Sequence, residues 1–274
     1  MTSSTAARPS DAELLDLAVA TAREAADLVA RGRATAGEQV EVKSSSVDMV
    51  TAVDRASEEL VVSRLLGARP GDGLLGEEGG ERTGTTGVRW IVDPIDGTTN
   101  FIYGVPAYAV SIAAEVHGRV RAGAVLNAAT GELFTATLGG GAQLSPPGQA
   151  PVALRCSSPA SLETSLVATG FGYRPEQRRE QGAVVARLLP EVRDIRRIGS
   201  AALDLCFLAA GRVDAYYEAH LNPWDYSAGC LIAAEAGAVV TGLPGHPFGT
   251  PLGIAAAPSV AEPFVALLDR LHRD

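Results

Sequence analysis

The first thirty residues repeat hydrophobic positions with the spacing of an amphipathic helix. Leu14, Ala18 and Val29 fall on one helical face, with polar residues between them. The Ser-Asp-Ala-Glu sequence at 10–13 is a capping box, in which the serine and glutamate side chains bond backbone N–H groups that the helix leaves unpaired. The pattern therefore predicts a helix that begins after the capping serine and ends at Gly32.

The middle third of the chain has the pattern of an antiparallel sheet. Apolar runs at 108–116, 120–127 and 132–137 are separated by His-Gly and Thr-Gly pairs, which favour tight turns. These runs predict consecutive hairpins. Before them, the pattern predicts short strands at 39–43, 74–75 and 88–92, a helix over 51–67 and a Gly/Thr-rich loop over 79–87.

Strands and helices alternate after a Gly/Pro-rich stretch at 139–151, which we interpret as a boundary between two halves. A hairpin-rich half followed by an alternating half predicts two sheets layered with helices. We expect one α/β domain made of pseudo-halves at about 11–150 and 151–274, preceded by a flexible tail at 1–10. The elements expected after the boundary are helices near 176–189, 200–210, 224–236 and 261–271, and strands near 165–169, 213–217, 238–241 and 252–256.

Composition narrows the possible functions. Of the 274 residues, 46% are hydrophobic and 20% are charged, which is typical of a globular protein. The formal net charge of -9 argues against nucleic acid as the main partner, since phosphate neutralisation needs clustered Lys and Arg. No apolar run approaches the ~20 residues of a membrane span. The first ten residues lack the apolar stretch of a signal peptide, so we expect a cytoplasmic protein.

The positions of the cysteines and histidines argue against a disulfide framework and against a zinc site. Cys156, Cys206 and Cys230 are far apart and odd in number, which favours reduced thiols over a disulfide framework. No His/Cys pair has the spacing of zinc ligands. A metal ion in this protein would therefore have to be held by oxygen atoms.

The segment 90–101, Trp-Ile-Val-Asp-Pro-Ile-Asp-Gly-Thr-Thr-Asn-Phe, carries the most chemical information. An apolar strand delivers Asp93 at its end, and Pro94 turns the chain out of the sheet because it has no N–H to donate. Asp93 and Asp96 can then face one cavity, where the carbonyl of Ile95 has no strand partner. These atoms are hard oxygen ligands suited to a divalent cation.

The next residues of this segment suit an anion. Gly97 allows a bulky ligand to approach the backbone, and Thr98 and Thr99 can begin a helical turn whose free N–H groups suit a phosphate. Cation ligands beside an anion cradle indicate phosphoryl transfer to water. The alternative is a solvent-exposed turn in which the two aspartates only cap a helix.

Three further acidic sites have similar features, each with a simpler alternative. Glu77 and Glu78 follow a short apolar strand between glycines, where a solvated acidic loop is the alternative. Asp225 follows Asn-Pro-Trp at the start of a helical pattern, and Asp48 and Asp54 flank another helix start. For these three aspartates the alternative is helix capping.

Taken together and in order, these blocks resemble the inositol monophosphatase family, the Mg²⁺-dependent, Li⁺-sensitive sugar phosphatases. The similarity extends from about residue 12 to the C-terminus, and bacterial inositol-1-monophosphatases are the nearest in pattern. The blocks that carry it are Lys-Ser-Ser at 43–45, Asp48 to Asp54, Gly-Glu-Glu at 76–78, Trp90 to Phe101, Arg196 to Ala202, Asp214 to Glu218 and Trp224 to Gly229.

The resemblance implies a fold and a metal site. The fold is a layered α-β-α-β-α sandwich with the site between its two halves. Two to three Mg²⁺ are expected: Glu77, Asp93 and the carbonyl of Ile95 would hold the first, and Asp93, Asp96 and Asp225 the second. Glu77 would also border a third, weaker site.

The resemblance also implies the reacting and substrate-binding groups. Asp54 and Thr98 would orient the attacking water, with Glu77 as a third catalytic residue, and the backbone at 97–99 would receive the phosphate. Ring hydroxyls of the substrate would meet Glu218, Ala201 and Asp96. The complete expected substrate set is Glu77, Ile95, Asp96, Gly97, Thr98, Thr99, Arg196, Ala201, Glu218 and Asp225.

The expected reaction is hydrolysis of myo-inositol 1-phosphate to inositol and phosphate, by in-line attack of a metal-activated water. A homodimer is expected from the resemblance. Fructose-1,6-bisphosphatase or histidinol-phosphatase activity at the same site, and a non-catalytic regulatory protein on this fold, are the alternatives. The loop at 79–89 is compact in a region that varies among relatives, and Asn222-Pro223 stands where animal members of the family have a His-Cys pair. The substrate range and the lithium potency therefore stay open.

Overall fold

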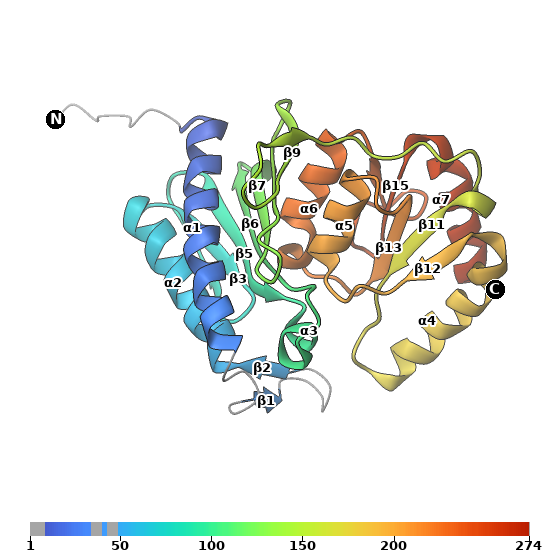
Figure 1. The fold of residues 1–274 in the computed structure, drawn as a ribbon, viewed down its shortest axis with the longest axis horizontal. Coiled ribbons are helices and arrows are strands. Elements are labelled where there is room, and N and C mark those ends of the chain that lie inside the picture. Colours follow the sequence, from blue (N-terminus) through green and yellow to red (C-terminus); the bar gives the residue numbers. More distant parts are fainter. Residues whose placement is uncertain (1–8, 34–39, 43–48, 274) are drawn as a thin grey trace.

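Two large β-sheets alternate with layers of helices (Figure 1). The computed structural model describes residues 9–33, 40–42 and 49–273 of the chain. Most of the tail at 1–10, the Lys-Ser-Ser block at 43–45 and Asp48 lie outside the described residues.

The first half of the chain builds an eight-stranded sheet in the order β10-β9-β8-β7-β6-β5-β3-β4. Helices α1 (Asp11–Gly32) and α2 (Ala52–Ala68) cover its outer face, and β1 (Val40–Val42) pairs with β2 (Met49–Thr51). The strands are β3 (Gly73–Gly76), β4 (Gly80–Arg82), β5 (Val88–Asp96), β6 (Ala109–Val116), β7 (Arg119–Asn127), β8 (Leu133–Thr137), β9 (Gly141–Ser145) and β10 (Val152–Ala153).

Side chains alternate across this sheet because successive residues of a strand point to opposite faces. In β5, Trp90 and Val92 pack into the core beneath α1 and α2, whereas Ile91 packs into the core on the opposite face. Both faces of the strand are thus buried, which explains why its sequence is an almost continuous apolar run.

The second half builds a five-stranded sheet in the order β12-β11-β13-β15-β14. Its strands are β11 (Leu166–Thr169), β12 (Asp194–Arg196), β13 (Ala215–Ala219), β14 (Val239–Thr241) and β15 (Leu252–Ala256). Its helices are α4 (Pro175–Leu188), α5 (Ala201–Ala209), α6 (Pro223–Glu235) and α7 (Pro258–Arg273), with 3₁₀ turns at Leu162–Thr164 and Leu189–Glu191.

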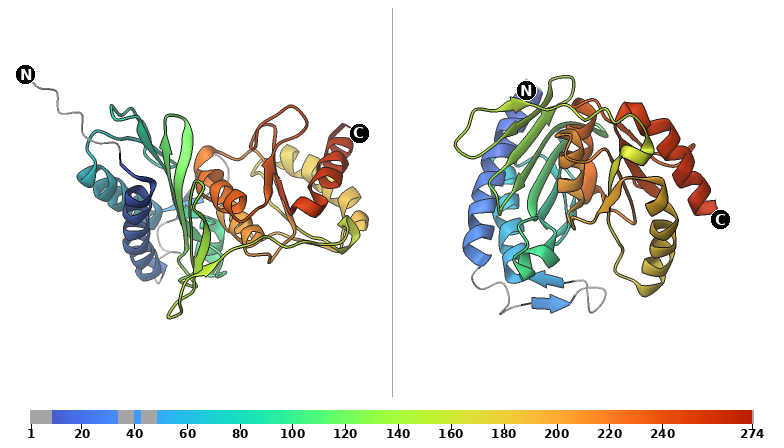
Figure 2. Two further views of the ribbon diagram at one scale, coloured as in Figure 1. Left: turned by 90° about the horizontal axis from the view of Figure 1, so that it is seen from above. Right: turned by 45° about the vertical axis from the view of Figure 1, so that its right-hand side comes forward.

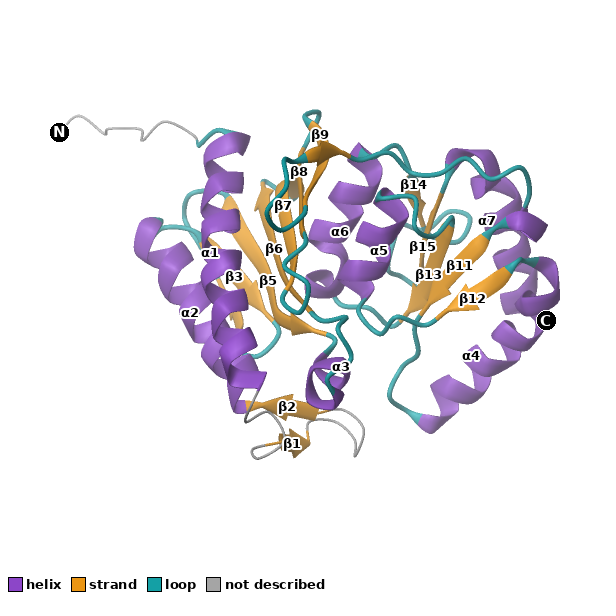
Figure 3. Cartoon of the chain, viewed as in Figure 1, coloured by secondary structure: helices purple, strands orange, loops and turns teal. Residues whose placement is uncertain are grey.

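Helices α5 and α6 form the middle layer between the two sheets (Figures 2 and 3). On α5, Ala202 and Cys206 pack toward the first sheet, while Leu205 and Leu208 pack toward the second. Helices α4 and α7 cover the outer face of the second sheet. This confirms the expected α-β-α-β-α order. None of the described helices is both long and apolar enough to span a membrane.

The structure changes the expected boundary between the halves. The Gly/Pro-rich stretch at 139–151 contains β9, and β10 extends the first sheet to Ala153. Ala142 and Leu144 of β9 are buried while Gln143 between them is exposed. The strand is short and flanked by glycines and prolines, so its alternation of buried and exposed residues could not be recognised from the composition of the stretch. Similarly, β4 lies inside the stretch at 79–87 that was expected to be a loop.

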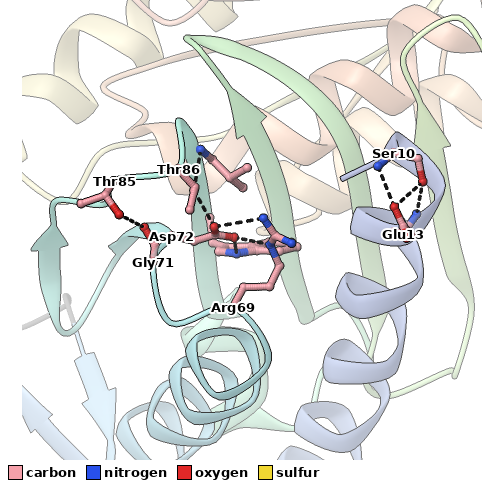
Figure 4. A network of polar contacts seen from close by, with 9 residues as sticks. Ser10, Glu13, Arg69, Gly71, Asp72, Thr85 and Thr86 are labelled. Atoms are coloured by element: carbon pink, nitrogen blue, oxygen red, sulfur yellow. Dashed lines mark hydrogen bonds and ion pairs between the residues drawn. The ribbon is translucent and has the colours of Figure 1, made fainter. Parts of the chain in front are cut away.

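A buried carboxylate fixes the connection from α2 into the first sheet. Asp72 accepts hydrogen bonds from Arg69 Nε at 2.6 Å, Thr86 Oγ1 at 2.6 Å and Trp90 Nε1 at 3.0 Å. Figure 4 shows Asp72 between Arg69 and Thr86, and the same view includes the capping box of Ser10 and Glu13 on α1. Because the carboxylate pairs with donors from three segments, it holds the start of β3 against β5.

We expect Asp72→Ala to lower the free energy of unfolding by about 2–4 kcal/mol, since it leaves the buried Trp90 indole N–H and the half-buried Arg69 without their acceptor. Urea denaturation followed by tryptophan fluorescence measures the change. Asp16→Ala, at an exposed position on α1, is the control and should stay within about 0.5 kcal/mol of the unsubstituted protein. Equal stability of the two variants would contradict this role of Asp72.

Candidate active site

A cavity of about 760 Å³ lies between the two halves, and both contribute to its lining. Strand β5 and the turns after β3 and β5 contribute from the first half, and the N-terminal turns of α5 and α6 contribute from the second. The expected site residues that line it are Glu77, Asp93, Ile95, Asp96, Gly97, Thr98, Thr99, Ala201, Glu218 and Asp225.

A bulge in β5 presents the first aspartates. The strand continues through Pro94 to Asp96, but its register against β6 shifts between Asp93 and Asp96. We expected the strand to stop at the proline; the bulge instead accommodates the missing N–H within the strand. The backbone N–H of Ile95 donates to Asp93 Oδ1 at 3.0 Å, so the irregular backbone itself orients this carboxylate.

The chain then reverses at Gly97, whose φ of 95° lies in the left-handed region that favours glycine. A Cβ at this position would lie 2.9 Å from the carbonyl oxygen of Ala107 and 3.0 Å from that of Gly199. Helix α3 (Thr98–Tyr103) begins immediately afterwards, as the sequence predicts. Gly97 is thus required both for its conformation and for the space around it.

Asp54 reaches the cavity through Thr98. It lies on the buried face of α2, is 1% exposed, and accepts a hydrogen bond from Thr98 Oγ1 at 3.0 Å. Thr98 Oγ1 also lies 3.1 Å from the carbonyl oxygen of Ile95. The structure therefore brings together the Asp54–Thr98 pair that the resemblance predicts, across 44 residues of sequence.

Asp96 joins the two halves. Its Oδ2 accepts hydrogen bonds from Ser200 Oγ at 2.6 Å and from the backbone N–H of Ala202 at 2.7 Å, at the start of α5. Asp225 lies in the first turn of α6, where its Oδ2 accepts from the backbone N–H of Asn222 at 2.6 Å. Asp225 is thus a capping residue, as the alternative interpretation held, and also lines the cavity.

Burial and mutual repulsion raise the pKa values of this group of acids. The pKa of Asp93 is well above its usual range because the carboxyl is buried and faces Glu77, Asp96 and Asp225. Burial, followed by repulsion from Asp96, raises the pKa of Asp225 in the same direction. Burial raises the pKa of Asp96 to about 6, although the hydrogen bonds from Ser200 and α5 oppose the shift.

The donor chemistry of the cavity fits a hard divalent cation. Its acidic side chains offer only oxygen donors, and positive charge would relieve the repulsion that raises the pKa of Asp93. Within the described residues, no three His, Cys, Asp or Glu side chains close on one point as a preassembled metal centre. The carboxylates thus share one cavity and one electrostatic field.

Glu218 occupies the second-half side of the cavity. It lies near the end of β13, and its Oε2 accepts a hydrogen bond from Tyr216 Oη at 2.8 Å. Burial raises its pKa to about 7, opposed by the Tyr216 hydrogen bond and by the charge of Arg197. Gly170 lines the cavity beside it, and a Cβ at Gly170 would lie 2.0 Å from Glu218 Oε1. The glycine therefore leaves the space that this carboxylate fills.

The structure places Arg197, rather than Arg196, at the cavity. Arg196 forms an ion pair with Asp194 at 2.5 Å and does not line the cavity, so the expected substrate role of Arg196 has no support in its position. The two arginines are adjacent on an extended chain, where neighbours point to opposite sides. Sequence proximity to the Gly-Ser-Ala-Ala block could not decide between them.

Two polar residues beside the site, Ser200 and Asp204, were not predicted from the sequence. Ser200 was recognised only as part of a motif, yet it bonds Asp96. Asp204 on α5 is 1% exposed, and neither of its carboxylate oxygens has a hydrogen-bond partner within the described residues. Burial and the nearby Glu218 raise its pKa well above the usual range. A charged residue inside an apolar helical face was the available signal for Asp204.

This fold and acidic cavity define a class of metal-dependent phosphomonoesterases. The chain belongs to the inositol monophosphatase family, whose model matches residues 10–272. It is 49% identical to the inositol-1-monophosphatase of Mycobacterium leprae over 247 residues, covering 87% of this chain and 84% of that protein. It is 41% identical to the Nus factor SuhB of Escherichia coli, with 85% and 86% covered. The solved structure of Mycobacterium tuberculosis SuhB matches with a TM-score of 0.83 at 45% identity, covering 96% and 98%.

The metal-free protein should lose stability as the pH rises from 4.5 to about 7, because the pKa of Glu218 is raised from 4.5 to about 7 by folding. Below this window Glu218 is protonated in both the folded and the unfolded state, so its contribution to the stability of the folded protein is fully present. As the pH rises through the window, the unfolded state releases its proton first, so folding becomes less favourable.

Thermal unfolding in excess EDTA across this pH range measures the effect. Glu218→Gln should reduce the slope of stability against pH, since the amide does not titrate. The exposed Glu59→Gln should keep the slope of the unsubstituted protein. An unchanged slope in Glu218→Gln would show that this carboxyl titrates alike in both states.

Proposed function

We propose that this chain is a Mg²⁺-dependent phosphomonoesterase that hydrolyses myo-inositol 1-phosphate to inositol and phosphate. The observation that carries the proposal is the Asp54–Thr98 hydrogen bond at the edge of a cavity lined by Glu77, Asp93 and Asp225. A cavity that only bound cations would need the acids but no paired hydroxyl. The name of the Mycobacterium leprae relative supports the same substrate.

The Asp54–Thr98 pair can orient a water molecule. Thr98 Oγ1 has one hydrogen, and when it donates that hydrogen to Asp54 Oδ1 only its lone pairs remain available. A water at the cavity side of Thr98 must then donate a hydrogen to Oγ1, which turns a lone pair of the water oxygen toward the cavity. Orientation of the nucleophile is the contribution of this pair.

The phosphate would lie at the turn between β5 and α3. The first N–H groups of a helix have no partner within the helix, so the backbone at 97–99 can donate to phosphate oxygens. Gly97 and Thr98 line the cavity at this turn. The phosphate would thereby lie next to the oriented water, as an in-line attack requires.

The proposal assigns two to three Mg²⁺ to the acids of the cavity. Glu77, Asp93 and the carbonyl of Ile95 would hold one ion, and Asp93, Asp96 and Asp225 another. When bound, the ions supply positive charge that offsets the carboxylates, activates the nucleophile and stabilises the leaving oxygen. Lithium sensitivity, a homodimeric assembly and a cytoplasmic location belong to the same proposal and are supported by the family resemblance.

A regulatory role is the second candidate, because one relative is named as a Nus factor. A non-catalytic descendant of this fold would be free to lose acids of the cavity. Here Glu77, Asp93, Asp96 and Asp225 are all present, together with the Asp54–Thr98 pair. The intact set supports catalysis, whether or not a regulatory partner also binds.

Phosphate release from inositol 1-phosphate, fructose 1,6-bisphosphate and histidinol phosphate tests the function. With Mg²⁺ we expect the highest kcat/KM on inositol 1-phosphate and no turnover in excess EDTA. Asp93→Asn should lower kcat by several orders of magnitude, since Asp93 is assigned to two ions. Preference for either other substrate would select that alternative activity, and full activity in EDTA would refute the metal assignment.

Glu218 should separate substrate recognition from chemistry. Glu218→Gln is expected to lower kcat/KM for inositol 1-phosphate by about 10–150-fold, the effect of a charge-assisted hydrogen bond of about 1.5–3 kcal/mol to a ring hydroxyl. Turnover of p-nitrophenyl phosphate, which lacks ring hydroxyls, should be nearly unchanged.

Gly170→Ala should reproduce this selective loss, because the new methyl group would occupy the space of the Glu218 carboxylate. Gly182→Ala is the matched control, since a Cβ at Gly182 meets nothing within 4 Å. Equal losses on both substrates would mean that Glu218 supports the metal site instead.

A further inference from the structure

The turn that carries Glu77 is folded around the carboxylate of Glu58. Glu58 lies on α2 and is only 4% exposed. Its Oε2 accepts a hydrogen bond from the backbone N–H of Glu78 at 2.8 Å, and its Oε1 accepts one from the backbone N–H of Gly79. A single carboxylate thus binds two consecutive N–H groups immediately after Glu77.

The glycines on either side of Glu77 and Glu78 make room for this carboxylate. A Cβ at Gly76 would lie 2.7 Å from Glu58 Oε1, and a Cβ at Gly79 would lie 2.5 Å from the same atom. Both distances are shorter than carbon and oxygen can approach without displacement. The Gly-Glu-Glu-Gly sequence is therefore shaped to enclose an acidic side chain from another element, and only its first glutamate lines the cavity.

Glu58 is part of a continuous contact between α2 and the site. Ser57 and Glu58 lie three and four residues after Asp54, and all three residues are buried on this helix. Asp54 accepts from Thr98, Ser57 Oγ donates to the carbonyl of Pro94 at 3.3 Å, and Glu58 binds the turn after β3. One rigid helix therefore contacts every first-half segment that presents a site residue.

We propose that Glu58 is a positioning residue, which fixes the backbone of the 76–79 turn so that the Glu77 carboxylate is directed into the cavity before a cation binds. The inference rests on the proposed function, in which Glu77 is a cation ligand. A flexible turn would have to be ordered when the ion binds, which weakens binding; a preordered turn avoids that loss. A carboxylate suits the task because both of its oxygens can accept. The amide of a glutamine has one acceptor, and its N–H₂ group would face a backbone N–H that also needs an acceptor.

The test is Mg²⁺ binding to the full-length protein, measured by titration calorimetry without substrate. Glu58→Gln should weaken Mg²⁺ binding by about 10–100-fold, the usual effect of removing a group that orients a metal ligand. At saturating Mg²⁺, kcat should recover to near that of the unsubstituted enzyme. Glu59→Gln, at the adjacent exposed position on α2, is the matched control and should leave binding unchanged.

Hydrogen exchange of the metal-free protein gives a readout independent of both metal and activity. The amides of Glu78 and Gly79 should exchange faster in Glu58→Gln than in the unsubstituted protein. In the control Glu59→Gln they should exchange at the rate of the unsubstituted protein. Gly79→Ala retains every charge but displaces the carboxylate, so it should reproduce both effects if Glu58→Gln fails to fold. Gly67→Ala on α2, where a Cβ meets nothing within 4 Å, is its control.

The possible outcomes are distinct. Faster exchange with unchanged Mg²⁺ affinity, or unchanged exchange at the two amides, would overturn the positioning role of Glu58. Absence of Mg²⁺ binding in the unsubstituted protein would instead refute the proposed function, and with it the assignment of Glu77. Weaker binding and faster exchange together support the inference.

Discussion

Burying several negative charges in one cavity is the constraint on which the rest of this structure depends. Asp93 and Asp225 come from different halves of the chain, yet the charge of Asp225 raises the pKa of Asp93. Isolated buried carboxylates are unfavourable because the protein interior solvates charge poorly. The arrangement can persist only if hydrogen-bond donors, a proton or a cation offsets the repulsion.

The fold supplies hydrogen-bond donors to these carboxylates from backbone N–H groups that have no partner within their own strand or helix. The bulge of β5 gives the N–H of Ile95 to Asp93, and the starts of α5 and α6 give the N–H groups of Ala202 and Asn222 to Asp96 and Asp225. Bulges and helix starts are the places where strands and helices leave N–H groups unused. The layered sandwich is therefore suited to this cavity, because one bulged strand and the N-terminal turns of two helices all line it.

The sequence was most informative where chemistry is local. The motif from Trp90 to Phe101 predicts the aspartates and the start of α3, since both depend on residues a few positions apart. It was least informative where an outcome depends on contacts distant in sequence. The choice of Arg197 over Arg196 depends on how β12 leaves the second sheet, and the nesting of Glu58 in the 76–79 turn depends on how α2 packs. Strand β9 was hidden for another reason, because its short alternation lies within a glycine- and proline-rich stretch.

Proton binding and cation binding are coupled in this cavity by the repulsion among its acids. Acids whose pKa values are raised by neighbours hold protons when no cation is present, so a cation must displace those protons to bind. Asp96 has a pKa of about 6, which places part of this exchange close to neutral pH. Asp96 also bonds Ser200 and Ala202 across the boundary between the halves. The hydrogen bonds from Ser200 and the start of α5 favour the ionised form of Asp96 against the effect of burial, so the packing of the two halves also prepares this carboxylate for positive charge.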